Sequence, residues 1–234
     1  MSQIRNLPRS QQQTGAIDLA VVTSPASAAA EAYRSLRSTV KFAGGEPPVR
    51  SLLVADAGTG GQHSAVAANL AAALALGGDS VVLVDADLRQ PRLHEFFRRG
   101  NETGLTEWLA EPDTVRPLPL SESGVPNLRL LTAGRSRETA GIAPGDLLSD
   151  DAFTQLLTLL REEATFTIID APALPEVGDA LAIAARVDAA LLLIRSGKTR
   201  RPAAQQAKDA LDRVGTRILG AVLTDAGGSR FFGR

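Results

Sequence analysis

The sequence contains no cysteine, and it has only one tryptophan and one tyrosine among its 234 residues. The absence of cysteine excludes disulfides, cysteine-ligated zinc and a cysteine nucleophile, and it fits a reducing compartment. No apolar run reaches the roughly 18 residues of a membrane-spanning helix, and the polar residues 1–15 lack an apolar signal core. We therefore expect a soluble, cytoplasmic protein without direct membrane insertion. The net charge of −1 gives no overall field for binding nucleic acid, so no nucleic-acid partner is expected.

The residues that are present favour an α/β fold. Hydrophobic residues make up 44% of the chain and aromatics only 4%, so the core must be built mainly from aliphatic side chains. Short apolar runs alternate with helical stretches, which predicts a mostly parallel central sheet with helices on both faces. The predicted strands are 51–55, 81–85, 128–132, 166–170, 190–195 and 218–223. The predicted helices are one from 28, capped by Ser27, and then 64–76, 147–161, 179–187 and 203–214.

The chain is predicted to form one domain. Residues 1–17 read as a flexible arm, 18–228 as the α/β domain and 229–234 as a short tail. The segment 111–127 is rich in Pro and Ser and is predicted to run over the surface. Trp108 and Phe153 are predicted to lie in the core.

A glycine-rich segment follows the first predicted strand. Residues 57–65 read Ala-Gly-Thr-Gly-Gly-Gln-His-Ser-Ala and lead into a helix. A strand, a glycine-rich loop and a helix form a phosphate cradle, because backbone N–H groups and the helix N-terminus attract the anion. An ordinary glycine-rich turn explains the string equally well. The candidate phosphate site consists of Gly58, Gly60, Gly61, Gln62, His63, Ser64 and Ala65.

This loop departs from the standard pattern G-x-x-x-x-G-K-[ST]. In register, Ala57 replaces the first glycine, Gln62 the second glycine and His63 the lysine, while Ser64 is retained as an expected Mg²⁺ ligand. We expect Gln62 to resist a left-handed backbone by about 1 kcal/mol or more. We also expect His63 to lack the charge of the lysine, because an imidazole with an ordinary pKa of about 6.5 is mostly neutral at physiological pH.

Two acidic strings lie at other predicted strand ends, where open α/β sheets bind ligands. Residues 85–89 read Asp-Ala-Asp-Leu-Arg, and residues 170–172 read Asp-Ala-Pro. Carboxylates placed there support Mg²⁺ and orient a hydroxyl or water beside a terminal phosphate, although an Asp also commonly caps a turn. The combination favours Asp85 and Asp87 as catalytic groups, and Ser64, Asp85 and Asp170 as Mg²⁺ ligands.

In this order and spacing, the strings resemble the bacterial tyrosine kinase family, the cytoplasmic kinase modules associated with capsule and exopolysaccharide export. Residues 31–37 resemble its E-x-x-R-x-x-R oligomerisation motif through Glu31, Arg34 and Arg37, residues 85–92 its Walker A′ string and residues 170–172 its Walker B string. The resemblance runs from about residue 24 to 223. It implies a P-loop NTPase fold of the deviant Walker A type, ATP with Mg²⁺, and homo-oligomers. It also implies a membrane-embedded polysaccharide co-polymerase as a partner at the inner face of the membrane.

The departures from the family pattern are as informative as the matches. Besides the altered loop, Thr224 stands where the family has an asparagine that reads adenine. The tail carries Phe231 and Phe232 where the family has tyrosines that become phosphorylated, and Tyr33 is the only tyrosine. Fold and assembly strings are kept while the loop, the base-reading position and the acceptor tail are all changed.

Three functions are compatible with these strings. The leading interpretation is a catalytically impaired, pseudokinase-like regulator or scaffold in polysaccharide biosynthesis. The alternative is an active ATP-dependent tyrosine kinase or ATPase, in which Arg89, or Arg34 or Arg37 of a neighbouring subunit, replaces the lysine charge. A relative of the partitioning or septum-positioning ATPases is the third, and the E-x-x-R-x-x-R string argues against it. For that string, a solvated helix face with intrahelical pairs is the simpler alternative to an interface.

Overall fold

A computed structural model of the protein describes residues 19–43, 48–58, 61–111, 117–135, 143–149, 151–174 and 178–225. The predicted arm at 1–17 and the predicted tail at 229–234 lie outside these residues. So do Thr59 and Gly60 of the glycine-rich loop and the two tail phenylalanines. The domain predicted for 18–228 is thus described from Leu19 to Asp225.

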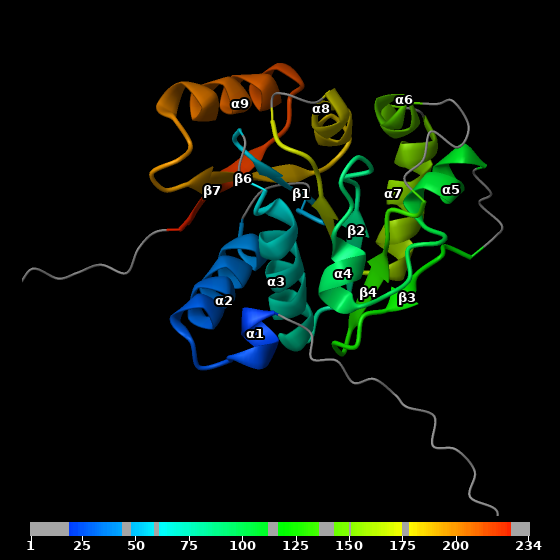
Figure 1. The fold of residues 1–234 in the computed structure, drawn as a ribbon, viewed down its shortest axis with the longest axis horizontal. Helices are drawn as coiled ribbons and strands as arrows, with labels where there is room; N and C mark the ends of the chain where they lie inside the picture. The colour runs from blue at the N-terminus through cyan, green and yellow to red at the C-terminus, as the bar shows by residue number, and fades with distance from the viewer. Residues whose placement is uncertain are drawn as a thin grey trace, which may run out of the picture.

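A seven-stranded sheet in the order β3-β4-β2-β5-β1-β6-β7 forms the centre of the fold (Figure 1). Neighbouring strands are parallel, except that β3 runs antiparallel to β4. Three adjacent strands, β2, β5 and β1, are buried along their whole length because helices cover both faces of the sheet. The strands are β1 Ser51–Asp56, β2 Val81–Asp85, β3 Ser121–Glu122, β4 Leu128–Leu131, β5 Phe166–Asp170, β6 Ala189–Arg195 and β7 Ile218–Thr224. The mostly parallel α/β fold predicted from the sequence is confirmed.

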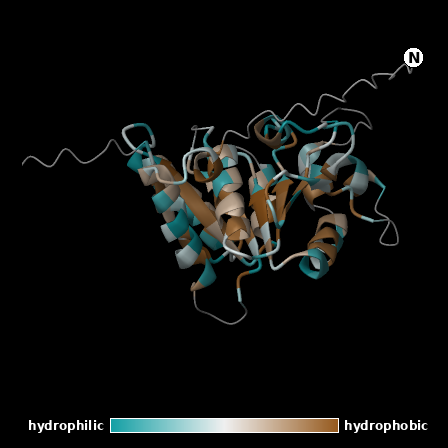
Figure 2. Cartoon of the chain, turned by 90° about the horizontal axis from the view of Figure 1, so that it is seen from below, coloured by the Kyte–Doolittle hydropathy of each residue, from teal (hydrophilic) through white to brown (hydrophobic). Residues whose placement is uncertain are grey.

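Helices pack on both faces of this sheet and create two apolar cores (Figure 1). One face is covered by α1 Ala20–Thr23, α2 Ala28–Lys41, α3 His63–Leu76 and α4 Leu93–Phe97. The other is covered by α5 Leu105–Ala110, α6 Pro144–Ser149, α7 Asp151–Glu163, α8 Gly178–Ala184 and α9 Arg201–Arg213. Figure 2 shows the apolar strands in the interior between these helical layers. No helix in the described ranges combines the length and the apolar character needed to cross a bilayer.

Most predicted elements agree with the structure to within one or two residues. The cap is confirmed, because the Ser27 hydroxyl accepts a hydrogen bond from the Ala30 N–H at 3.1 Å. Trp108 and Phe153 are buried in the core, as predicted.

Other predictions were wrong. The helix predicted over 147–161 is two helices, α6 and α7, and residues 149–151, Ser-Asp-Asp, are types that favour a helix start over its interior. The edge strand β3, which pairs with β4 and belongs to the segment 111–127, was not predicted. The short helices α1, α4 and α5 were not predicted; each has six residues or fewer, which is too short to show a helical period.

Helix α3 is the element that positions the site. It is buried on nearly all sides because it lies between the sheet and α2, and its many alanines allow close approach. The Arg37 guanidinium of α2 donates to the Ala73 carbonyl near the end of α3 at 3.3 Å. The N-terminus of α3 follows the loop after β1 and therefore lies at the carboxyl edge of the sheet.

Candidate functional site

Three adjacent strands each end in a buried aspartate. Asp85 ends β2, Asp170 ends β5 and Asp56 ends β1, and the sheet order places these strands side by side. Asp85 and Asp170 are direct partners in the parallel register between β2 and β5. All three residues are at most 3% exposed. The fold thus concentrates negative charge in one place, which requires either protons or a nearby cation.

The two carboxylate oxygens of Asp85 have different surroundings. Its Oδ2 accepts hydrogen bonds from the Arg92 N–H at 3.1 Å and the Leu93 N–H at 2.9 Å. Its Oδ1 is buried and has no hydrogen-bond partner within the described part of the chain. Burial and then the charge of Asp170 raise the pKa of Asp85 well above its ordinary value, against the effect of the two N–H bonds. A cation near Oδ1 would restore the charged form.

His63, at the lysine position, points into this acidic cluster. Its Nδ1 lies 2.7 Å from Asp170 Oδ1, its Nε2 lies 3.7 Å from Asp87 Oδ2, and the Ser64 hydroxyl lies 3.3 Å from Nδ1. Burial alone favours the neutral ring. The hydrogen bond to Asp170 and the charges of Asp170, Asp56 and Asp87 outweigh burial and raise the pKa of His63 to about 9.

The expectation that His63 is uncharged was therefore wrong. Its ordinary pKa predicts a neutral ring, but the surrounding carboxylates stabilise the imidazolium. Burial also raises the pKa of Asp170, and the bonds from His63 and Ser64 oppose that rise. The loop therefore keeps a positive charge on His63, and this imidazolium is paired with Asp170 at the end of β5.

The backbone of the loop differs from expectation at Gln62. Gln62 has φ −107° and ψ −3°, so no left-handed strain exists at this position and the predicted penalty was wrong. Among the loop residues that the structure describes, the positive φ values belong to Gly58 at 107° and Gly61 at 64°, where glycine has no steric cost. The Gln62 side chain donates to Asp225 Oδ1 at 3.0 Å, and Arg195 donates to Asp225 Oδ2 at 2.6 Å. Gln62 thus links the loop to the ends of β6 and β7.

Asp56 is a site residue that we did not single out from the sequence. Its Oδ2 accepts hydrogen bonds from the Gln62 N–H at 3.0 Å and the His63 N–H at 3.3 Å. These are the amides where the loop enters α3. The signal was present, because β1 ends in aspartate as β2 and β5 do.

The remaining residues of the acidic string have local partners. Asp87 Oδ1 accepts from the Gln90 N–H at 3.0 Å. Arg89 forms a two-point ion pair with Asp179 at the start of α8, at 2.7 and 3.2 Å. The Arg89 side chain is half exposed, and in this structure its charge is directed to α8.

The oxygen donors at the strand ends fit a magnesium ion. Mg²⁺ prefers one or two carboxylates, water and substrate phosphates, and Asp85, Asp170 and Ser64 offer suitable oxygens. Among the described residues no group of three or more His, Cys, Asp or Glu side chains could hold a metal ion by itself. A magnesium ion would therefore need water or phosphate as further ligands, and His63 would compete with it for Asp170.

The three residues of the oligomerisation string lie on α2. Arg34 pairs with Glu31 in the same helix at 2.6 Å and donates to the Pro25 carbonyl, while Arg37 contacts α3. Glu31 remains exposed over 67% of its side chain. Thr224, at the predicted base-reading position, ends β7, and its buried Oγ1 has no hydrogen-bond partner in the described ranges.

Comparison with known proteins points to one group. No family model matches the chain. Tyrosine-protein kinase YwqD of Bacillus subtilis (strain 168) is 33% identical over 202 residues, 86% of this chain and 83% of YwqD. The putative tyrosine-protein kinase CapB of Staphylococcus aureus is 30% identical over 88% of each protein. Tyrosine-protein kinase Etk of Escherichia coli (strain K12) is 31% identical over 94% of this chain and 30% of Etk.

Solved structures agree with these relatives. The kinase domain of Escherichia coli tyrosine kinase ETK has a TM-score of 0.83 and 27% identity, covering 100% of this chain and 86% of that one. The chimerical protein CapA2B2 has a TM-score of 0.79 and 29% identity, with 88% of each chain covered. The cell division ATPase MinD of Pyrococcus furiosus shares the fold, with a TM-score of 0.63 and 24% identity over 77% of this chain and 74% of that one.

Proposed function

This chain belongs to the bacterial tyrosine-protein kinase family, and we propose that it is a catalytically impaired member that acts as a regulator or scaffold in capsular or exopolysaccharide biosynthesis. The family membership rests on the relatives and on the shared fold. The impairment rests on the geometry of the phosphate loop.

One observation carries the proposal. The side chain at the lysine position is a buried imidazole whose Nδ1 lies 2.7 Å from Asp170. In an active loop this position supplies a flexible cation to the terminal phosphates of the nucleotide. His63 is shorter than lysine and is already bonded to the carboxylate that would support Mg²⁺. Reaching a phosphate would require breaking this buried ion pair, so little charge is left for the transition state.

Magnesium and the strand-end residues would have separate roles. When bound, the ion would neutralise charge on the phosphates. Ser64, Asp85 and Asp170 would hold it, and Asp87 would orient an attacking hydroxyl. Here the imidazole of His63 lies beside both Asp170 and Asp87. These contacts favour the arrangement without magnesium over one in which the carboxylates hold the ion.

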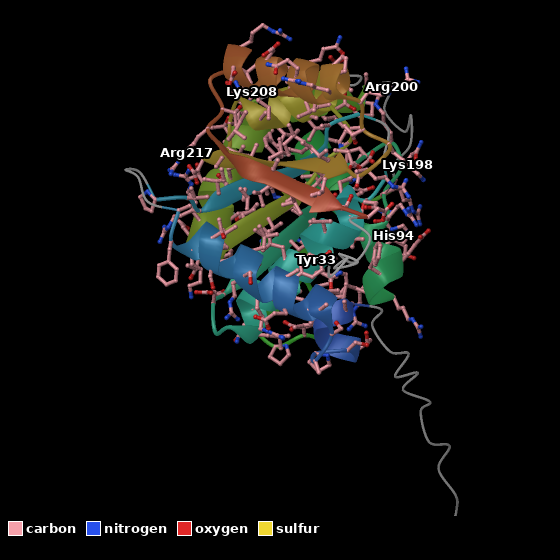
Figure 3. All side chains as sticks on the ribbon, turned by 90° about the vertical axis from the view of Figure 1, so that its left-hand side faces the viewer. Tyr33, His94, Lys198, Arg200, Lys208 and Arg217 are labelled. Atoms are coloured by element: carbon pink, nitrogen blue, oxygen red, sulfur yellow. The ribbon has the colours of Figure 1, made fainter. Side chains whose placement is uncertain are left out.

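The acceptor side of the kinase reaction is also changed. Tyr33 is the only tyrosine in the sequence. It lies on α2 (Figure 3), where it packs against the apolar core between α2 and the sheet. Burial raises the pKa of its hydroxyl above the ordinary value. Tyr33 is therefore poorly placed to be phosphorylated, and the tail carries phenylalanine in place of tyrosine.

We place the scaffold role in homo-oligomers that meet a membrane-embedded co-polymerase at the cytoplasmic side of the membrane. The exposed Glu31 on α2 supports this role, because a second subunit can reach it. The Glu31–Arg34 pair within the helix is weak and exposed, so exchanging it for a pair between subunits costs little. ATP with Mg²⁺ would act in such an assembly as a weakly bound ligand.

Nucleotide turnover tests the impairment. We expect no Mg-ATP-dependent phosphate release above background from the full chain, and the same background from Asp87→Asn. The kinase domain of Etk serves as the positive control in the same assay. Clear turnover by the parent chain that Asp87→Asn abolishes would contradict the proposal.

The positive charge of His63 favours a second candidate, an active kinase or ATPase with an atypical loop. Its pKa of about 9 means that a cation remains at the lysine position at neutral pH. If this function is correct, phosphate release should be measurable and should fall in Asp87→Asn. It should stay unchanged in Asp209→Asn, which alters an exposed carboxylate on α9.

A further inference from the structure

The amides that begin α3 are already occupied by a carboxylate of the protein. The first N–H groups of a helix have no partner within the helix and attract anions. Helix α3 has 14 residues, and Asp56 Oδ2 accepts hydrogen bonds from the Gln62 and His63 N–H groups at its start. In a phosphate loop, the backbone amides at these two positions help to hold the phosphates of the nucleotide.

Asp56 cannot easily leave this position. It ends β1, which is paired with β5 on one side and with β6 on the other, and its own partner in β6 is Leu193. The next residue continues this anchoring, because the Ala57 N–H donates to the Leu193 carbonyl at 2.8 Å. Asp56 is 3% exposed. Its backbone is therefore fixed by the centre of the sheet, and its side chain has little free space.

The two residues that donate their amides to Asp56, Gln62 and His63, are also held by side-chain bonds. Gln62 donates through its side chain to Asp225 at 3.0 Å, and Asp225 is bonded to Arg195 at the end of β6 at 2.6 Å. His63 is bonded to Asp170 at 2.7 Å. The side chains of Gln62 and His63 are thus bonded to Asp225, which follows β7, and to Asp170, which ends β5, while their amides donate to Asp56.

We propose that Asp56 is an internal anion that occupies the phosphate cradle and excludes the phosphate groups of a nucleotide from it. An incoming phosphate would lose these two amides to Asp56 and would also meet its negative charge at short range. The inference rests on the proposed function, because it gives a cause for weak nucleotide binding in a chain that keeps the fold. In this proposal, the residue that excludes phosphate from the loop is Asp56, which lies outside the standard loop pattern.

The test is the affinity for inorganic pyrophosphate, measured by titration calorimetry without added Mg²⁺. Asp56→Ser removes the charge and shortens the side chain, so the amides of Gln62 and His63 become available. The matched control is Asp209→Ser, which removes a carboxylate from the exposed face of α9 and changes the net charge equally. We expect Asp56→Ser to bind pyrophosphate about tenfold or more tightly than the parent, and Asp209→Ser to bind like the parent.

The proposal is overturned if Asp56→Ser, with its native circular dichroism, stays within about twofold of the parent, or if Asp209→Ser gains as much. If Asp56→Ser fails to fold, nuclear magnetic resonance of the parent chain with pyrophosphate tests the proposal instead. Its Gln62 and His63 amide resonances should not move when pyrophosphate is added, and a saturable shift of both would refute the inference. Turnover of Mg-ATP by the parent would instead contradict the proposed function, so the two failures are distinguishable.

Discussion

Replacing His63 with glutamine removes a positive charge that interacts with Asp170, Asp56 and Asp87. Glutamine can still donate a hydrogen bond to Asp170, so the substitution tests the charge more than the contact. The effect should depend on pH, because the pKa of His63 is raised from 6.5 to about 9 in the folded chain. Burial opposes this rise, and the hydrogen bond to Asp170 and the charges of Asp170, Asp56 and Asp87 produce it.

The sign and size follow from linkage between protonation and folding. A group with a raised folded pKa stabilises the fold fully below its unfolded pKa, and this contribution is lost as pH rises through the folded pKa. A rise from 6.5 to about 9 corresponds to roughly 3 kcal/mol at about 1.4 kcal/mol per pKa unit. The free energy of unfolding of the parent, relative to His63→Gln, should therefore fall by roughly 3 kcal/mol between about pH 6 and pH 9.5.

Urea denaturation at a series of pH values measures this difference directly. Subtracting the variant from the parent cancels the titration of groups whose pKa does not depend on His63. His94→Gln is the matched control, since His94 is the only other histidine in the sequence. Parallel curves for the parent and His63→Gln over the whole range would refute the buried imidazolium.

Two further predictions concern other parts of the fold. Asp188 accepts hydrogen bonds from the Arg50 and Ser51 N–H groups and from Arg161, so Asp188→Ala should lower the free energy of unfolding by about 2–4 kcal/mol at neutral pH. Burial raises the pKa of Asp188, but these bonds outweigh burial and lower the pKa below 3.8. The loss of unfolding free energy in Asp188→Ala should therefore shrink as pH falls below that value. An equal loss at low and neutral pH, measured by urea denaturation, would contradict this. Glu31→Arg should reduce the mass of the assembly measured by light scattering while leaving the fold intact, because only a weak helical pair is lost. Charge reversal at Asp212, which pairs with Lys208 on α9 (Figure 3), should leave the mass unchanged, and an unchanged mass for Glu31→Arg would argue against an α2 interface.

Local patterns were sufficient for the fold class and for most of the sheet. The strands β2 and β5 have the predicted bounds, because an apolar run that ends in aspartate is readable without knowledge of its neighbours. Short elements such as α4 and β3 were missed. Each is too short to show a period, and each depends on contacts outside the element itself, for example the Asp85 carboxylate at the end of β2 that accepts the Leu93 N–H at the start of α4.

The sequence indicated where most residues of the candidate site lie, but it indicated neither Asp56 nor the electrostatics of the site. Asp85, Asp87 and Asp170 lie at strand ends as expected, and His63 and Ser64 begin the helix above them. The charge of His63 could not be predicted, because a pKa depends on burial and on charges that come from other strands. The relaxed backbone of Gln62 also depends on the way the loop enters α3.

The sequence by itself determined the parallel α/β sheet, the glycine-rich loop and the acidic strand ends, since each depends on residues that are close along the chain. Only the tertiary structure decided that β2, β5 and β1 lie side by side, and therefore that Asp56 and Asp170 contact the start of α3 while Asp85 lies beside Asp170. The physical reason is that strand order is set by long-range packing. Charges that are far apart in the sequence interact strongly only after packing has brought them together and removed water from between them.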